Sequence, residues 1–177
     1  PIDVSNINYS FKSKEDKSIS SQNNKSDRYR MLFFAPVKDF YEYEYENYLT
    51  RKYGMWEEFY LFEYLFYGTD YVDLVVLDIG RSSKATIKDL YEDFAYSFDK
   101  STFCYDTTEG DENIIWKAYA EYASLCEGME AMDVNSSGKP FGGYVLINPD
   151  NEIVCYGNDG DYFKKLRNYV EDNAVVK

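Results

Sequence analysis

The sequence offers few side chains for acid–base or metal chemistry. It contains no histidine, which excludes Ser-His-Asp and Cys-His catalytic arrangements and removes the imidazole that most catalytic zinc sites use. The three cysteines are Cys104, Cys126 and Cys155. They lie too far apart in the chain to form a CxxC motif, so neither a metal knuckle nor a dithiol motif is present. We therefore expect no metal site and no cofactor.

The same three cysteines are nevertheless the candidate redox thiols of the chain. Cys104 and Cys155 fall in expected strands and Cys126 at an expected helix end. Two of them could form a disulfide only if their Cα atoms came within about 7 Å. Free cysteines are among the most buried residue types, so structural burial is the favoured interpretation of each.

Acidic side chains gather at or just after the carboxyl ends of expected strands, where open α/β sheets bind their ligands. An acid–base pair or a hard cation such as calcium is conceivable there. Loop acids are more often solvated or cap helices, and that interpretation is favoured here. The residues are Asp78, Asp106, Glu109, Asp111 and Glu112.

Length and charge narrow the class of protein. With 177 residues and 45% hydrophobic content, the chain is long enough for one domain with a proper core. Its net charge of −13, without a cluster of Lys and Arg, argues against nucleic-acid and anionic-membrane binding. A basic protein partner stays open. No apolar run reaches the ~18 residues that a transmembrane helix needs, and the polar stretch 1–29 would suit an N-terminal membrane tether.

The elements that would position these residues alternate between strand and helix. Periodicity predicts strands over 29–36, 70–80, 101–106, 144–147 and 152–156, and helices over 38–53, 55–67, 86–98 and 113–126, with a last helix after 161. Residues 1–29 read as a leader or a short β-hairpin. In the helix over 113–126, the inward residues should be Ile115, Ala118, Tyr119, Tyr122 and Leu125. This order predicts a mainly parallel sheet that ends in an antiparallel hairpin and is covered by helices on both faces.

The stretch 139–155 is a strand entered through a proline, a tight turn and a second strand. Tyr144–Ile147 is a short apolar run. The turn is Asn148-Pro149-Asp150-Asn151, in which the proline presets φ and the polar residues tolerate turn conformations.

This element order, together with Gly138-Lys139-Pro140-Phe141 before the hairpin, resembles the thioredoxin-like superfamily. Within it, the chain looks like the extracytoplasmic branch of thiol-disulfide oxidoreductases and peroxiredoxin-related proteins. The resemblance covers roughly residues 30–172 and implies one thioredoxin-like domain over 30–177, with the N-terminal hairpin that this branch carries. It also implies that Pro140 is the family's cis-proline, whose loop touches the backbone of bound substrates. It further implies a location outside the cytoplasm, in the bacterial periplasm or tethered to a membrane.

The resemblance also implies a reactive site after the first core strand, where a helix N-terminus would lower a thiol pKa. No cysteine stands there: the two family positions fall near Lys38 and Tyr41. The Thr and Cys of the peroxiredoxin pattern are absent as well. The expected binding face consists of this loop, the loop 78–82 and the segment before the hairpin. Its named residues are Pro36, Val37, Lys38, Asp39, Tyr41, Lys139, Pro140 and Phe141.

Three functional hypotheses follow. The first is a redox-inactive thioredoxin-fold protein that binds a protein or peptide through this face. Because the family's reactive cysteines are absent, a binding protein is favoured over an enzyme. The second is a thiol-disulfide oxidoreductase or peroxidase that uses displaced cysteines. The third is an acidic inhibitor or immunity-type protein that covers a basic target, which the net charge of −13 motivates.

Overall fold

The computed structural model describes residues 1–24, 27–37, 72–93, 101–129, 142–157, 168–169 and 172. All statements on structure below concern these residues. The helices expected over 38–53 and 55–67 lie outside them, as does most of the helix expected after residue 161.

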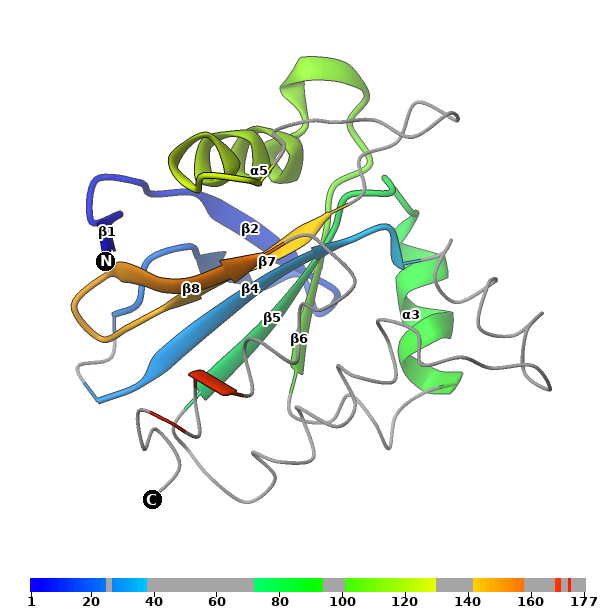
Figure 1. Ribbon diagram of the computed structural model, residues 1–177. Helices are drawn as coiled ribbons and strands as arrows, with labels where there is room; N and C mark the ends of the chain where they lie inside the picture. The colour runs from blue at the N-terminus through cyan, green and yellow to red at the C-terminus, as the bar shows by residue number, and fades with distance from the viewer. Residues whose placement is uncertain are drawn as a thin grey trace, which may run out of the picture.

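A mixed eight-stranded sheet forms the centre of the described structure (Figure 1). Its spatial order is β1-β8-β7-β4-β5-β6-β2-β3. Strands β4, β5 and β6 are parallel, whereas β7 is antiparallel to β4 and to β8. The predicted mixed sheet and its closing hairpin are therefore confirmed. The expectation of a mainly parallel sheet is wrong, because five of the seven strand pairings in the described residues are antiparallel, including those that the N-terminal strands add. The strands are β1 Ile2–Asp3, β2 Ser10–Ser13, β3 Ser18–Ser20, β4 Tyr29–Ala35, β5 Val72–Asp78, β6 Ser101–Tyr105, β7 Gly143–Ile147 and β8 Glu152–Gly157.

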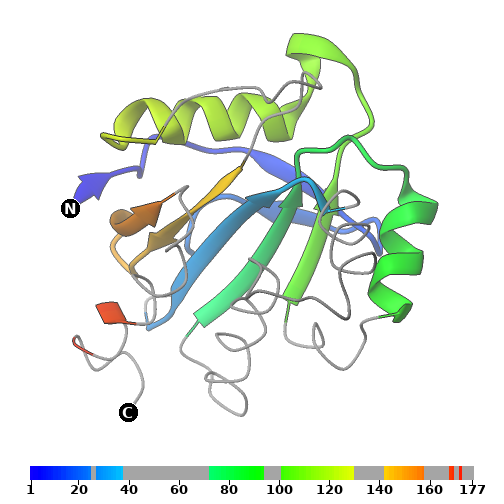
Figure 2. The same cartoon turned by 45° about the vertical axis from the view of Figure 1, so that its right-hand side comes forward.

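Two α-helices and one 3-10 turn are described: α3 Lys84–Asp93, η1 Gly110–Glu112 and α5 Ile114–Leu125. Helix α5 is capped by Asn113, whose side-chain oxygen accepts the N–H of Trp116 at 3.0 Å, a standard N-cap bond. Helix α3 begins after Ser83, whose hydroxyl accepts the N–H of Thr86 at 3.2 Å. Figures 1 and 2 show α5 across one side of the sheet and α3 beside β6, away from α5.

The core on the α5 side explains the apolar runs of the central strands. Alternate residues of β4, β5 and β7 point to this side and pack against α5, and the N-terminal Val4, Ile7 and Phe11 fill the same cluster. Four of the five α5 residues predicted to point inward are buried. Leu125 is 42% exposed, so its predicted inward position is wrong, because the helix ends there and Cys126 leaves the helical path.

The N-terminal hairpin expected before the core is present. Strands β2 and β3 pair antiparallel, with Phe11 opposite Ile19. Strand β2 then joins the sheet through Lys12 and Ser13, which face Tyr105 and Cys104 of β6. We call residues 1–24 the N-terminal segment, and it is part of the core, since its apolar side chains pack under α5.

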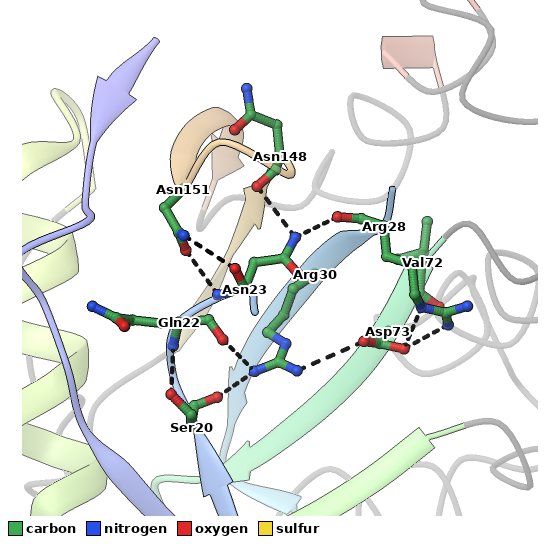
Figure 3. A network of polar contacts seen from close by, with 9 residues as sticks. All are labelled: Ser20, Gln22, Asn23, Arg28, Arg30, Val72, Asp73, Asn148 and Asn151. Carbon is green, nitrogen blue, oxygen red and sulfur yellow. Dashed lines mark hydrogen bonds and ion pairs between the residues drawn. The ribbon is translucent and has the colours of Figure 1, made fainter. Parts of the chain in front are cut away.

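A polar network joins this segment to the turn between β7 and β8 (Figure 3). The Asn23 N–H donates to Asn151 Oδ1 at 2.7 Å, and Asn151 Nδ2 donates back to the Asn23 carbonyl at 3.1 Å. The Asn23 amide also donates to the carbonyls of Asn148, at 3.2 Å, and of Arg28. The left-handed φ of 59° at Asn151 is one that asparagine tolerates well.

Two arginines extend the network to β5. Arg28 donates to Asp73 Oδ1 from Nε, at 2.9 Å, and from Nη2, at 2.5 Å. Arg30 lies 3.6 Å from the other oxygen of Asp73 and donates to the carbonyls of Ser20 and Gln22. Because these cations are half-buried, an acid beside them is needed to offset their desolvation.

Candidate functional site

The carboxyl ends of β4 and β5 meet at one edge of the sheet, with Ala35 opposite Asp78. Parallel sheets bind ligands at this edge because their loops converge there. Pro36 and Val37 leave β4 here, and residues 79–82 leave β5. Two elements complete the edge: the start of α5 and Gly142, which precedes β7. We call the set Pro36, Val37, Asp78–Ser82, Trp116, Tyr119 and Gly142 the carboxyl-edge site.

A buried carboxylate holds the first two loops of this site together. Asp78 has no solvent exposure. Its Oδ1 accepts the backbone N–H of Val37 at 3.1 Å and that of Gly80 at 3.0 Å, and its Oδ2 accepts the N–H of Ser82 at 2.7 Å. Backbone bonding between Ile79 N–H and the Ala35 carbonyl, at 3.0 Å, reinforces the junction.

The protonation of Asp78 is set by two opposing effects. Burial disfavours its charged form, and the three backbone donors favour it. Burial is the larger effect, so the pKa of the Asp78 carboxyl is raised above its ordinary value. Because both oxygens already accept main-chain N–H groups, this side chain holds the backbone and is not placed to bind a cation.

The other acids at the strand ends are helix caps or exposed residues. Asp106 accepts the N–H of Thr108 at 2.9 Å and of Ile114 at 2.8 Å, which fixes the start of α5. Glu109, Asp111 and Glu112 are exposed. Within the described ranges, no group of three His, Cys, Asp or Glu side chains is arranged to hold a metal ion.

An arginine–tryptophan pair lies beside the Asp78 junction. Trp116 donates its indole Nε1–H to the Ile79 carbonyl at 2.6 Å. The Arg81 guanidinium carbon lies 4.6 Å from the centroid of the Trp116 ring, a cation–π distance. Arg81 has φ 56°, a left-handed backbone that is unfavourable for arginine. The sequence analysis did not predict this pair, because no local sequence pattern around Arg81 or Trp116 indicates that the two side chains meet.

Tyr119 and Gly142 fix the chain where it enters β7. The Tyr119 hydroxyl donates to the Gly142 carbonyl at 3.0 Å. The centroid of the Tyr119 ring lies 5.2 Å from the centroid of the Phe34 ring. Gly142 has φ 94°, and a Cβ there would lie 2.2 Å from the Phe34 carbonyl oxygen. Only glycine fits this approach, so Gly142 lies close to the end of β4.

Of the predicted binding face, the structure brings Pro36 and Val37 to this site, where both are buried. Lys38, Asp39 and Tyr41 lie outside the described residues, and so do Lys139, Pro140 and Phe141. The predicted cis bond before Pro140 therefore also lies outside them.

None of the three cysteines forms a disulfide bond. Cys104, in β6, and Cys126, at the end of α5, are buried, and burial raises the pKa of their thiols to about 12 and about 11. Such thiols carry little thiolate at neutral pH and are poor nucleophiles. Cys155, in β8, is partly exposed, and its sulfur lies 3.5 Å from the Tyr144 hydroxyl.

No protein-family model and no curated protein matches the sequence. Solved structures do match, over nearly the whole chain. A thiol-disulfide oxidoreductase from Bacteroides fragilis matches 94% of this chain and 97% of its own, with 14% identity and a TM-score of 0.53. Yeast Sco1 matches 95% and 92%, with 12% identity and a TM-score of 0.60.

A third similar structure is the pneumococcal exposed lipoprotein thioredoxin from Streptococcus pneumoniae, which matches 94% of this chain and 99% of its own, with 9% identity and a TM-score of 0.53. Likeness at such low identity reports on the fold. The chain has the thioredoxin-like fold, as its sequence predicts.

Proposed function

We propose that this chain, which has the thioredoxin-like fold, is a redox-inactive binding protein that takes up an extended protein or peptide segment at the carboxyl-edge site. One observation carries the proposal. The Asp78 carboxylate joins the loops after β4 and β5 through main-chain bonds, at the edge where this fold performs its function, and the chain has no cysteine near residue 37.

A joined edge of this kind suits recognition. A site whose loops are already fixed loses less conformational freedom when a ligand binds, and this raises affinity. Three separate contacts fix the edge: Asp78 to Val37, Trp116 to Ile79 and Tyr119 to Gly142. Gly142 lies close to the end of β4. This close approach of two backbones supports a site that contacts the main chain of the bound segment beside Gly142.

Thiol chemistry is the second candidate. The names of similar structures include thiol-disulfide oxidoreductases, and Cys155 is a partly exposed thiol. The raised pKa values of Cys104 and Cys126 count against a dithiol made from either of them. A location outside the cytoplasm is also part of the proposal, and it is supported by the similarity to an exposed lipoprotein. No described helix is long and apolar enough to cross a membrane.

The test separates binding from thiol turnover. An unfolded model protein with alkylated cysteines is titrated into the isotope-labelled chain, and backbone amide signals are followed by NMR. We expect saturable shifts at Val37, Gly80 and Ser82, which surround the Asp78 carboxylate. The folded form of the same model protein should produce none.

Disulfide reduction is measured in parallel with the wild-type chain and with a variant in which all three cysteines are serine. We expect no turnover above background in either protein. Turnover that the triple variant loses would favour the displaced-cysteine alternative, and absence of any shift at the carboxyl-edge site would overturn the binding proposal.

A further inference from the structure

Arg81 differs from the other arginines that the structure describes. Arg28 and Arg30 both lie against Asp73. Arg81 forms no ion pair with any residue in the described part of the chain, although the sequence contains 32 acidic residues. It is nevertheless only partly exposed. Among the described residues, Arg81 is therefore a half-buried guanidinium that contacts an aromatic ring and pairs with no carboxylate.

The backbone around Arg81 is fixed from both sides. Asp78 accepts the N–H groups of Gly80 and Ser82, the two residues that flank it. Trp116 donates its indole N–H to the carbonyl of Ile79, two residues before Arg81. These bonds maintain the unfavourable φ of 56° at Arg81, since strained conformations persist where the surroundings determine them. The direction in which the side chain leaves the loop is therefore set before any ligand arrives.

Trp116 then orients the guanidinium itself. The guanidinium carbon of Arg81 lies over the Trp116 ring, 4.6 Å from its centroid, and a guanidinium held against one aromatic ring keeps N–H groups that can donate to a ligand. Those N–H groups match the two oxygens of a carboxylate. The geometry is thus that of a positioned carboxylate receptor at the carboxyl-edge site.

We infer that Arg81, held over the Trp116 ring, recognises a glutamate or aspartate side chain in the extended segment that the carboxyl-edge site binds. This inference rests on the proposed function and adds the chemistry of the partner. The net charge of −13 repels an acidic segment in general. Binding of such a segment therefore depends on Arg81, and removal of this one cation should abolish the preference.

The experiment uses two extended peptides that are identical except for one central Glu or Gln, with both termini blocked. Their affinities are measured for the wild-type chain and for R81Q and K88Q. Lys88 is an exposed cation of α3, with 67% of its side chain accessible, so K88Q makes the same change in net charge away from the site. R81N provides a second variant, because asparagine tolerates a left-handed backbone.

We expect the wild-type chain and K88Q to bind the Glu peptide about tenfold more tightly than the Gln peptide, the effect of one charge-assisted hydrogen bond. R81Q and R81N should bind both peptides equally. A Glu preference that survives in both Arg81 variants would overturn the inference. Equal binding of both peptides to the wild-type chain, with shifts at Val37 and Gly80, would also overturn it while leaving the proposed function intact.

Two further outcomes are informative. If neither peptide binds, the inference and the proposed function both fail.

A third peptide carries Gln and a free C-terminus. If this peptide alone gains affinity through Arg81, the carboxylate comes from a chain end, and the assignment to an acidic side chain is overturned. The indole N–H signal of Trp116 serves as a second readout, since its bond to Ile79 adjoins the Arg81 guanidinium.

Discussion

Val37 donates its backbone N–H to the buried carboxylate of Asp78 at 3.1 Å. This single bond joins the segment after β4 to the segment after β5, and two more N–H groups converge on the same carboxylate. The relationship explains how Pro36 and Val37, the described residues that follow β4, keep a defined place at the edge of the sheet.

Replacement of Asp78 by asparagine tests this relationship. The amide has nearly the same shape, but its NH₂ group would face a backbone donor and could not accept from it. We expect the free energy of unfolding to fall by about 1–3 kcal/mol, measured by urea denaturation. Asp111→Asn removes the same charge at an exposed position and should change it by less than about 0.5 kcal/mol. Equal effects of the two substitutions would contradict the assigned role.

The pKa of Asp78 predicts a pH dependence. Burial raises that pKa above its ordinary value of 3.8, so between the ordinary and the raised values the folded state binds more protons than the unfolded state. The free energy of unfolding contributed by this group therefore falls as pH rises through that window. We expect the difference between the wild-type chain and Asp78→Asn to shrink accordingly. A difference that grows with pH in this window would mean that the N–H donors outweigh burial.

Gly142 and Gly128 form a matched pair for testing the approach of β7 to β4. Both have positive φ, 94° and 85°, but a Cβ at Gly142 would meet the Phe34 carbonyl oxygen at 2.2 Å, whereas one at Gly128 would meet nothing within 4 Å. Both alanine substitutions carry the backbone cost. Gly142→Ala should cost at least about 1 kcal/mol more, because of overpacking. Comparable unfolding midpoints and slopes for the two variants would contradict the close approach.

The cysteines should differ in reactivity. Cys155 is partly exposed, whereas Cys104 and Cys126 are buried with thiol pKa values of about 12 and about 11. Iodoacetamide at pH 8 should therefore alkylate Cys155 first, as peptide mass spectrometry would detect. In Cys155→Ser, rapid alkylation should disappear until urea unfolds the chain. Fast labelling of Cys104 in the native state would contradict its described burial.

The fold could be predicted because its signals are local. The continuous apolar runs of β4 and β5 indicate strands buried on both faces, and the Asn148–Asn151 turn indicates the β7–β8 hairpin. Boundaries were less accurate where a cap decides them. Helix α3 starts at Lys84, two residues before the predicted start at Thr86, because the Ser83 hydroxyl caps it.

The site could be predicted only in part. Pro36 and Val37 were placed by resemblance to a family, and both lie at the carboxyl edge. The role of Asp78 and the pairing of Arg81 with Trp116 depend on contacts between loops and helices that are distant in sequence. Neither periodicity nor spacing contains that information, and an acid at the end of a strand looks the same whether it binds a ligand or holds a backbone.

The bonds between Asn23 and Asn151 have a consequence for the order of events during synthesis. Asn23 leaves the ribosome long before its partners, because 128 positions separate the two residues. Until the β7–β8 turn emerges, the first residues of the chain cannot complete these bonds, and contacts of such separation form late. Asn23 is thus made early and completes its bonds late, and a nascent chain halted before residue 151 should still expose residues 1–24 to proteases.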